Sequence, residues 1–337
     1  MATGSCPADT HWPLDLDLGR FPPVLCVIGY GSGVFRQAGY ENVPRPMVDL
    51  IFVVKECDLQ SWHSENLQMH PEHYAGMPRL LGSAAVANVQ RWGPGVYFHP
   101  HVSLHTDKGD KLQAKYGVVT LEALMEDLQA WTWLYLAGRM HKPFIMDWQA
   151  CSSGTNWGCL AEAVLANRRA ALCAALLLSS SLRSDCDKHD ADASSVNLGS
   201  MQLLESIVRL SYDGDVRVGI GEDPRKVQNI VAAQHGHLWG IYQPILADLG
   251  LEVMAAPLDL TRRQQLFEQL PLPIQKRAAA AAAATADTPW ADSGPLRRTL
   301  SGIVRRSSIQ QTAKGIVTSG ISRTVRYSLA KLAKRFK

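Results

Sequence analysis

A turn of small residues and a nearby carboxylate are the residues of this chain best suited to carry chemistry. Gly31, Ser32 and Gly33 follow one apolar run, and Asp49 lies near the start of a second, Val48–Val54. The backbone N–H groups of such a turn can bind phosphate oxygens, and a carboxylate can hold the Mg²⁺ that accompanies a nucleoside triphosphate. The pattern therefore predicts a magnesium-dependent site for nucleotidyl transfer.

The same residues also have a purely structural interpretation. A Gly-Ser-Gly sequence is common in tight turns between core strands, where glycine allows a positive φ. Asp49 favours the functional interpretation, because a carboxylate within an otherwise apolar strand needs a cation or several hydrogen-bond donors. A metal ion bound to phosphate would supply that cation.

A second metal-binding carboxylate would have to come from elsewhere in the chain, since only Leu50 and Ile51 follow Asp49 directly. Several acids gather in one polar, glycine-containing stretch: Asp213, Asp215, Glu222 and Asp223. Each of them, taken singly, is more typical of a solvated loop.

Other polar and basic side chains could contact the phosphates of a nucleotide. These candidates are Arg36, His63, Ser64, Lys115, Tyr116 and Arg139. The cations among them would offset the charge of two polyanions brought together. Any one of these residues alone would more often be structural.

Histidine pairs give a weak signal for zinc. His99, His101 and His105 lie along one predicted strand, and His235 and His237 form a second pair. No cysteine or acid stands at ligand spacing, so we expect no zinc site. The glycines also fail to match the dinucleotide-binding and P-loop patterns.

The composition describes a globular protein with an uneven charge distribution. The chain has 337 residues, 46% of them hydrophobic and 19% charged, with a formal net charge of +3. No acid follows Asp292, so the C-terminal region is strongly basic. The 7 cysteines show no C-x-x-C spacing and are expected to be free thiols in a reducing compartment. No apolar run reaches the roughly 18 to 20 residues of a membrane-spanning helix.

The segment 314–337 has the pattern of a basic amphipathic helix. Its apolar face would carry Ile321, Val325, Leu329, Leu332 and Phe336, and its cations include Arg326, Lys331 and Lys334. Such a helix can lie in the interface of an anionic bilayer. A helix packed on the body of the protein is the alternative. Few aromatic residues separate the cations, which disfavours binding to single-stranded nucleic acid.

Strands and helices are mixed in the first half of the chain, which predicts an α/β fold. The expected strands are Val24–Gly29, Val48–Val54, Val96–Leu104 and Lys115–Thr120. The expected helices there are Met77–Gln90 and Leu121–Leu136, the second capped by Thr120.

From about Trp148 the pattern is mainly helical. The expected helices are Leu160–Leu178, Met201–Leu210 and two within Val227–Leu249, with a solvated loop at Ser179–Ser200. The Ala-rich run 278–286 predicts either an isolated helix or a linker.

Short motifs spread in order over residues 24–320 resemble those of the mitochondrial phosphatidate cytidylyltransferase family. In the first half these are Tyr30–Gln37, Val48–Phe52, Trp62–Leu67, Gly95–Phe98, Lys115–Val118 and Leu134–Arg139 with Lys142-Pro143. In the second half they are Leu210–Arg217, Gly221–Asp223, Lys226–Val231, Arg306–Ile309 and Thr312–Gly315. No single motif is specific, but the ordered set is.

The resemblance implies a nucleotidyltransferase-fold domain with a mixed sheet, then a smaller helical, winged-helix-like domain and a C-terminal amphipathic helix. With the composition, it gives a flexible leader at 1–20, a nucleotidyltransferase domain at 21–147 and a helical domain at 148–270. An Ala/Pro-rich linker would follow at 271–295 and a basic membrane-binding tail at 296–337.

The resemblance also implies a reaction, in which CTP and phosphatidate give CDP-diacylglycerol and pyrophosphate with Mg²⁺. Gly31, Ser32 and Asp49 would fall on nucleotide and metal positions, and Asp215 would be a further catalytic or metal-binding acid. The lipid phosphate is already ionised and would attack directly, so no side-chain base is needed. The protein would act peripherally on the matrix side of the inner mitochondrial membrane, through anionic lipids, and feed cardiolipin synthesis.

Two other functions stay open from the residues alone. The chain could be a catalytically silent scaffold of nucleotidyltransferase type, since its second strand carries a single carboxylate. It could also transfer a nucleotide to RNA or protein, although no nucleic-acid partner is expected from the tail.

Overall fold

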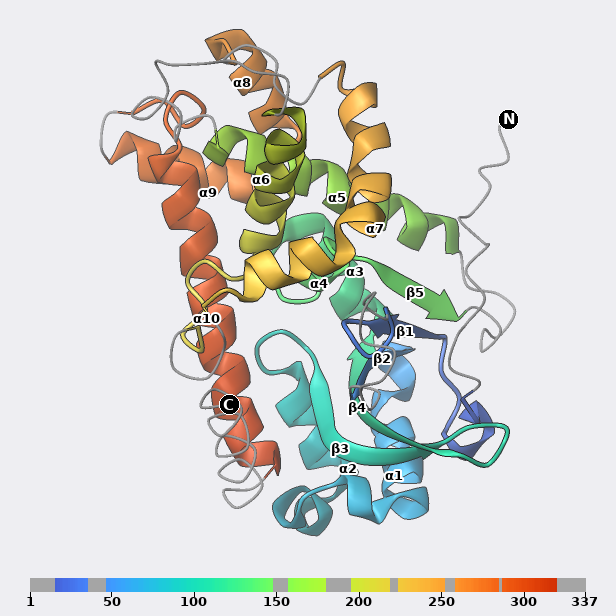
Figure 1. The fold of residues 1–337 in the computed structure, drawn as a ribbon. Helices are drawn as coiled ribbons and strands as arrows, with labels where there is room; N and C mark the ends of the chain where they lie inside the picture. Colours follow the sequence, from blue (N-terminus) through green and yellow to red (C-terminus); the bar gives the residue numbers. More distant parts are fainter. Residues whose placement is uncertain are drawn as a thin grey trace. The chain divides into compact units, whose positions relative to one another are not determined.

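The computed structural model describes residues 16–35, 47–147, 157–179, 195–218, 224–251, 258–284 and 287–319 (Figure 1). The chain forms two compact units. Of the described residues, the first unit holds those within Met1–Met125, Phe144–Glu162 and Gln310–Lys337, and the second holds those within Glu126–Pro143 and Ala163–Ile309. We call them the sheet unit and the helical unit.

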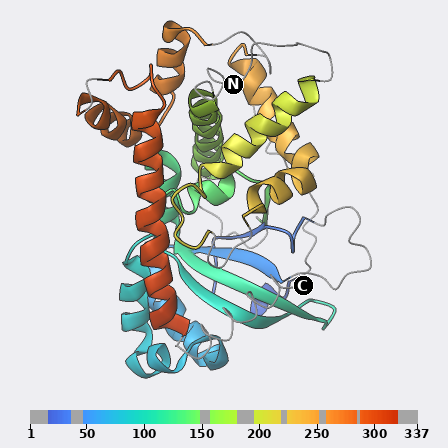
Figure 2. The same ribbon diagram turned by 60° about the vertical axis from the view of Figure 1, so that its left-hand side comes forward.

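The sheet unit is built on a mixed sheet of five strands in the order β3-β4-β2-β1-β5. The strands are β1 (Cys26–Tyr30), β2 (Val48–Val54), β3 (Tyr97–His105), β4 (Lys111–Thr120) and β5 (Phe144–Asp147). β2 and β4 run parallel, and the other neighbouring pairs are antiparallel. Figure 2 shows β3 and β4 as a long hairpin. The predicted mixed α/β sheet is confirmed.

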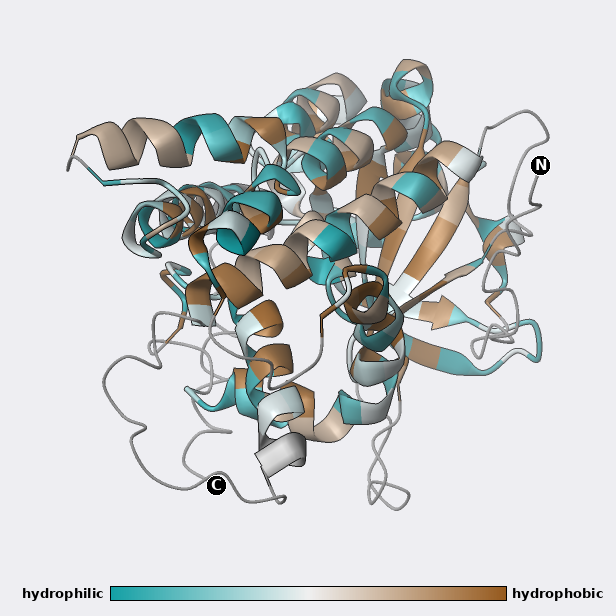
Figure 3. Ribbon diagram, turned by 90° about the horizontal axis from the view of Figure 1, so that it is seen from above, coloured by the Kyte–Doolittle hydropathy of each residue, from teal (hydrophilic) through white to brown (hydrophobic). Residues whose placement is uncertain are grey.

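Two helices, α1 (Leu59–Met69) and α2 (Gly76–Arg91), pack against one face of this sheet. Alternate residues of β2, such as Leu50 and Phe52, join Trp62 of α1 and Ala87 of α2 in a single apolar core. The strands are accordingly coloured largely as apolar in Figure 3. Because side chains of a strand alternate between faces, Asp49 lies on the opposite face from this core.

The helical unit contains helices among its described residues and no strand. They are α4 (Ala137–Met140), α6 (Ser195–Arg209), α7 (Lys226–Asp248), α8 (Leu260–Glu268) and α9 (Leu272–Ala283), together with parts of α3 (Leu121–Ala130), α5 (Trp157–Ser179) and α10 (Gly294–Ser319). No described helix is both long enough and apolar enough to span a bilayer.

A buried carboxylate shapes the segment after α3. The carboxylate of Asp127 accepts hydrogen bonds from the backbone N–H groups of five successive residues, Trp133–Ala137. Trp131 and Leu134 take positive φ there, so the chain leaves the helical path. The prediction of one helix over Leu121–Leu136 is therefore wrong after Ala130, because this carboxylate offers the backbone better partners than helix continuation does.

Buried polar contacts then fix α4 within the helical unit. Asn167 of α5 accepts from Trp131 Nε1 at 2.8 Å and donates to the carbonyl of Ala137 at 3.1 Å. Tyr242 of α7 donates to the carbonyl of His141 at 2.7 Å. These bonds satisfy groups that would otherwise be buried without a partner.

Other predicted elements are confirmed with shifted ends. Thr120 does cap α3, since its hydroxyl accepts from the Ala123 N–H at 3.3 Å. The Ala-rich run lies largely in a helix, α9, and α7 is two helical pieces joined at a kink at Gln234. The loop predicted to reach Ser200 gives way to α6 at Ser195. Helix α1, strand β5 and helix α10 were not predicted.

The end of α10 belongs to the sheet unit and carries a buried lysine. Lys314 is 1% exposed, and its Nζ donates to the carbonyls of Gln90 and Val96 at 3.0 and 3.1 Å. No acid contacts it among the described residues. Burial without a negative partner lowers the pKa of Lys314 to about 7.

We predict that the urea midpoint of the wild type rises with pH between about 7 and 10.5 through Lys314. In that range the unfolded lysine still binds a proton that the folded one has released, so raising the pH favours the folded state. Lys314→Met should lack this rise, whereas Lys111→Met, at an exposed position, should keep it. Parallel pH profiles for the wild type and Lys314→Met would contradict the assignment.

Candidate functional site

The predicted turn and the predicted carboxylate lie together in the sheet unit. Tyr30, at the end of β1, pairs in register with Asp49 on β2, so the chain enters the turn beside that side chain. Gly31 has φ +79°, a left-handed conformation that favours glycine. A Cβ on Gly31 would lie 3.4 Å from Asp49 Oδ2. The lack of a side chain at Gly31 thus keeps the space beside the carboxylate open.

The turn itself is tightly packed against the start of β2. A Cβ on Gly33 would lie 2.5 Å from the carbonyl oxygen of Met47 and 2.8 Å from the Cα of Val48. The N–H groups of Val34 and Phe35 both bond to the carbonyl of Gly31. Glycine at position 33 is therefore required by this close backbone approach.

The residue between the two glycines faces solvent. Ser32 is exposed, and within the described part of the chain neither its hydroxyl nor its N–H has a hydrogen-bond partner. A donor pair in this position can bind an anionic oxygen without first breaking a protein contact.

The carboxylate of Asp49 is half-buried and uncompensated. Among the described residues it accepts no hydrogen bond and forms no ion pair. Lys115 is its register partner on β4, but the Lys115 Nζ lies over the ring of Phe98, 4.2 Å from its centroid, and no ion pair joins it to Asp49. A partly desolvated carboxylate with no protein cation is suited to hold a metal ion.

Two other predicted residues lie on the opposite face of the sheet. Tyr116, next to Lys115 on β4, points into the apolar core, and its hydroxyl accepts from Asn66 Nδ2 at 3.0 Å. His63 of α1 is fully buried, with its ring nitrogens 2.9 Å from the Tyr74 hydroxyl and 2.7 Å from Gln90 Oε1. Burial lowers the pKa of His63 to about 4, so the ring is neutral. The structure therefore does not bring these two residues to Asp49.

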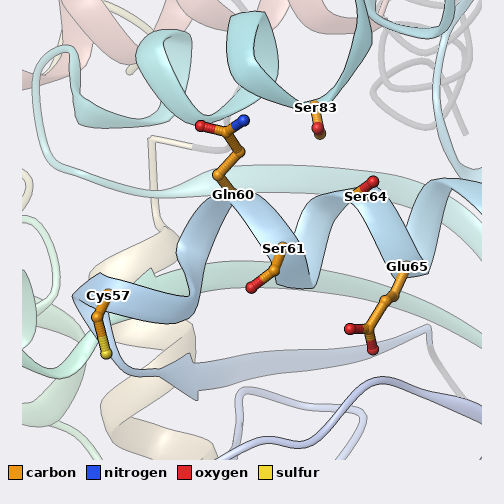
Figure 4. A pocket seen from close by; sticks show the side chains of 6 residues that line it. All are labelled: Cys57, Gln60, Ser61, Ser64, Glu65 and Ser83. Carbon is orange, nitrogen blue, oxygen red and sulfur yellow. The ribbon is translucent and has the colours of Figure 1, made fainter.

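Ser64 lies at a separate pocket formed by α1, the turn before it and Ser83 of α2 (Figure 4). The pocket is lined by Cys57, Gln60, Ser61, Ser64, Glu65 and Ser83. Its lining includes the acid Glu65 and no basic side chain, which makes it a poor site for phosphate groups.

The predicted acid Asp215 belongs to the helical unit and already has a cation. Its Oδ1 accepts from the backbone N–H and Nε of Arg217, both at 2.9 Å, and its Oδ2 accepts from Nη2 at 2.6 Å. Asp213, two residues earlier, lies 3.9 Å from Arg297, and burial raises the pKa of its carboxyl. The Asp215 carboxylate thus stabilises the turn that contains Arg217 and is already neutralised by that arginine.

Basic side chains gather near the same turn in the helical unit. Lys142 donates to Ser211 Oγ at 3.2 Å, and the Nζ atoms of Lys142 and Lys226 each lie 5.3 Å from the centroid of the Tyr212 ring. Arg139, a predicted site residue, packs its guanidinium over Tyr135 at 3.8 Å. Lys142 and Lys226 belong to the motifs found in the sequence. Their common contact with the Tyr212 ring was not predicted, because it depends on how α7 packs within the helical unit.

The histidines differ from the simple strand pattern. A register irregularity between His99 and Val102 interrupts β3, and His101 takes φ +55°. His99 is fully buried and His101 is exposed, so the two rings do not share one face of the strand, as an unbroken H-x-H strand pattern would require. A different group, His70, Glu72 and His73, has ligand atoms within 4.8 Å of one another.

Several predicted residues lie outside the described ones. These are Arg36, Glu222, Asp223 and the tail residues Ile321, Val325, Arg326, Leu329, Lys331, Leu332, Lys334 and Phe336. For them the roles stay predictions.

Comparison with known proteins gives the same family along nearly the whole chain. The family model described as "Phosphatidate cytidylyltransferase, mitochondrial" matches residues 17–334. A Xenopus laevis protein of that name is 35% identical over an alignment that covers 94% of this chain and 92% of the relative. A Drosophila melanogaster protein of the same name is 35% identical over 95% of this chain and 97% of its own length.

A fungal relative extends the comparison. The Saccharomyces cerevisiae protein, also named mitochondrial phosphatidate cytidylyltransferase, is 30% identical over 93% of this chain and 67% of its own length. The family match includes both the glycine turn and Asp49. The chain belongs to the mitochondrial phosphatidate cytidylyltransferase family.

Proposed function

We propose that this protein converts CTP and phosphatidate into CDP-diacylglycerol and pyrophosphate in a magnesium-dependent reaction. The observation that carries the proposal is the uncompensated carboxylate of Asp49 beside the left-handed Gly31. The names of its relatives supply the substrate class.

In this proposal the residues of the turn bind and orient the nucleotide. Ser32 offers its hydroxyl and N–H to phosphate oxygens, and the glycines let the backbone approach them closely. Asp49 would hold Mg²⁺, which when bound neutralises the triphosphate and polarises the α-phosphorus. The ionised lipid phosphate attacks that phosphorus and pyrophosphate leaves, so no side chain has to remove a proton.

Basic side chains reduce the repulsion between the two substrates. Lys115 is the register partner of Asp49 on β4. Its ammonium group would therefore contact the phosphates of a nucleotide bound beside Asp49. Arg36 and Arg139 stay proposed for the same purpose. Bringing two polyanions together costs several kcal/mol at about 4 Å unless cations or metal offset it.

Asp215 is proposed as a further catalytic or metal-binding acid on the resemblance alone. To bind a metal it would have to exchange the Arg217 guanidinium that now contacts both carboxylate oxygens. His63, Ser64 and Tyr116 have no role in this proposal, since the described contacts of His63 and Tyr116 lie within the core and Ser64 lines a separate pocket.

The cellular setting is also a proposal. The names of the relatives place them in mitochondria. We propose peripheral binding to the matrix side of the inner membrane through the segment 320–337, with the product feeding cardiolipin synthesis. A winged-helix-like arrangement of the helical unit belongs to the same proposal.

We predict that Asp49→Asn lowers CDP-diacylglycerol formation by at least about 100-fold, because the neutral amide cannot compensate a bound cation. The assay follows labelled CTP into lipid with Mg²⁺ and phosphatidate, with ATP and GTP as alternative donors. Folding should survive, since Asp49 has no protein partner to lose. Asp110→Asn, at an exposed position, is the matched control. Activity of Asp49→Asn near that of the control would remove Asp49 from the mechanism.

We predict that deleting residues 320–337 weakens sedimentation with anionic vesicles by about tenfold or more, because the basic amphipathic segment is lost. The deletion starts after Ser319 so that the buried Lys314 stays in place. Val325→Ser, Leu329→Ser and Leu332→Ser together keep every cation and test the apolar face alone. Unchanged sedimentation of the deletion variant would argue for a tail that packs elsewhere.

A further inference from the structure

The first six residues of α2, Gly76–Leu81, include three large apolar side chains that are exposed. Met77 is 59% exposed, Leu80 is 80% exposed and Leu81 is 59% exposed. Pro78, between them, is buried, so the turn rests on the unit through Pro78 while its other side chains face outward. Clustered exposure of this kind marks an interaction surface more often than isolated exposure does.

Two glycines bound this exposed turn. Gly82 has φ +79° and ψ 177° and breaks α2, which separates the turn Gly76–Leu81 from the rest of the helix. A Cβ on either Gly76 or Gly82 would meet no atom within 4 Å. The turn is therefore a short helical piece with open space at both ends.

The charge on this surface is positive. The sequence of α2 contains no acid, and of its two arginines Arg91 is paired with Glu56 at 2.8 Å, so Arg79 is the cation of the exposed turn. Arg79 is exposed and, among the described residues, forms no ion pair. A cation set between exposed apolar side chains is the pattern of a segment that lies at an anionic bilayer surface.

Charge also argues against two other occupants. The segment 320–337 of this chain carries basic residues and no acid, so it would be repelled by Arg79. A second copy of the same turn would bring the same positive charge. An anionic bilayer complements both the cation and the apolar side chains.

We infer that the turn Gly76–Leu81 inserts Met77, Leu80 and Leu81 into the acyl boundary of an anionic bilayer. The turn thereby gives the sheet unit a membrane contact of its own, separate from the C-terminal segment. The choice of a bilayer rests on the proposed function, because a phosphatidate substrate lies in a membrane.

The first test replaces the three side chains together. M77S/L80S/L81S should bind vesicles of phosphatidylcholine and phosphatidate about tenfold more weakly than wild type, both in the full chain and in residues 1–319. The matched control is L165S/L260S/L272S, which removes three side chains that are 54%, 62% and 59% exposed in the helical unit. Equal binding of the two triple variants would overturn the inference.

The second test asks what covers the turn. Backbone hydrogen exchange over residues 76–81 should slow when vesicles are added, in the full chain and in residues 1–319. Exchange that vesicles leave unchanged would overturn the inference. So would exchange that is slow without vesicles and becomes fast when 320–337 is removed, because that segment would then be the occupant.

Turnover separates this inference from the proposed function. M77S/L80S/L81S should retain wild-type turnover of a short-chain, water-soluble phosphatidate and lose turnover of phosphatidate in vesicles. If the wild type turns over neither form, the proposed function fails, while vesicle binding and hydrogen exchange still decide whether the turn contacts lipid.

A second inference comes from an independent feature, the short 3-10 turn Pro71–His73 that follows α1. His70 Nδ1 and His73 Nε2 lie 3.6 and 3.5 Å from the same Oε1 of Glu72. The other ring nitrogens have protein partners, since His70 Nε2 is 2.6 Å from the carbonyl of Arg20 and His73 Nδ1 is 3.0 Å from the Tyr116 hydroxyl.

These partners decide which ring nitrogens are free to bind. A carbonyl only accepts, so His70 must carry its proton on Nε2, which leaves the Nδ1 lone pair of a neutral ring facing a carboxylate oxygen. A hydroxyl oxygen has two lone pairs, so the Tyr116 oxygen, which accepts from Asn66 Nδ2, has room to accept from His73 Nδ1 as well, and in that tautomer the Nε2 lone pair of His73 is free. With these tautomers, the lone pairs of His70 Nδ1 and His73 Nε2 both point at the Glu72 carboxylate, and this arrangement needs a cation between them.

We infer that His70, Glu72 and His73 form a site for a divalent transition metal such as Zn²⁺, with the Arg20 carbonyl and Tyr116 orienting the two rings. Nitrogen and carboxylate ligands of this kind suit zinc and leave a fourth position open. The group was missed in the sequence because its three members fall in adjacent, individually unremarkable positions.

The test titrates metal-free protein with Co²⁺ in excess Mg²⁺ and follows the visible absorption of the bound ion. Wild type should bind one equivalent more than His70→Ala or Glu72→Gln, while His105→Ala and Glu65→Gln serve as controls. Equal binding by all the variants would overturn the site. A wild type that binds no Co²⁺ here would overturn the site as well.

Discussion

The pairing of Tyr30 with Asp49 is the constraint on which the rest of the site depends. This register brings the glycine turn beside a carboxylate that no described protein group neutralises. Within a folded protein such a charge is costly unless a cation arrives. In the function proposed here, a metal ion that arrives with the nucleotide would compensate this carboxylate.

Side-chain alternation distributes the polar candidates for the site over the two faces of the sheet. Asp49 and Lys115 lie on one, while Leu50 and Tyr116 lie on the other among apolar and hydrogen-bonded aromatic groups. Neighbouring residues of one motif therefore have different surroundings. The motif Lys115–Val118 looks like a single functional unit in the sequence, yet its lysine and its tyrosine point to opposite sides.

The elements that could be predicted from sequence were those with strong local signals. β2, with its apolar run, and the Thr120 cap of α3 depend on neighbours in the chain. The end of α3 could not be predicted, because it depends on Asp127 binding five N–H groups beyond the helix. The turn and Asp49 were predictable as chemistry, whereas the Arg217 partner of Asp215 and the His70 group required the folded chain.

The anchoring of Lys314 has a consequence for geometry at a bilayer. Because the Lys314 side chain fixes the end of α10 to the sheet unit, residues 320–337 follow directly on the unit that carries the glycine turn. As a helix, residues 320–337 would reach about 27 Å. If that segment binds a bilayer as proposed, it would hold the sheet unit within a thin layer of solvent above the lipid and so raise the effective concentration of each headgroup there.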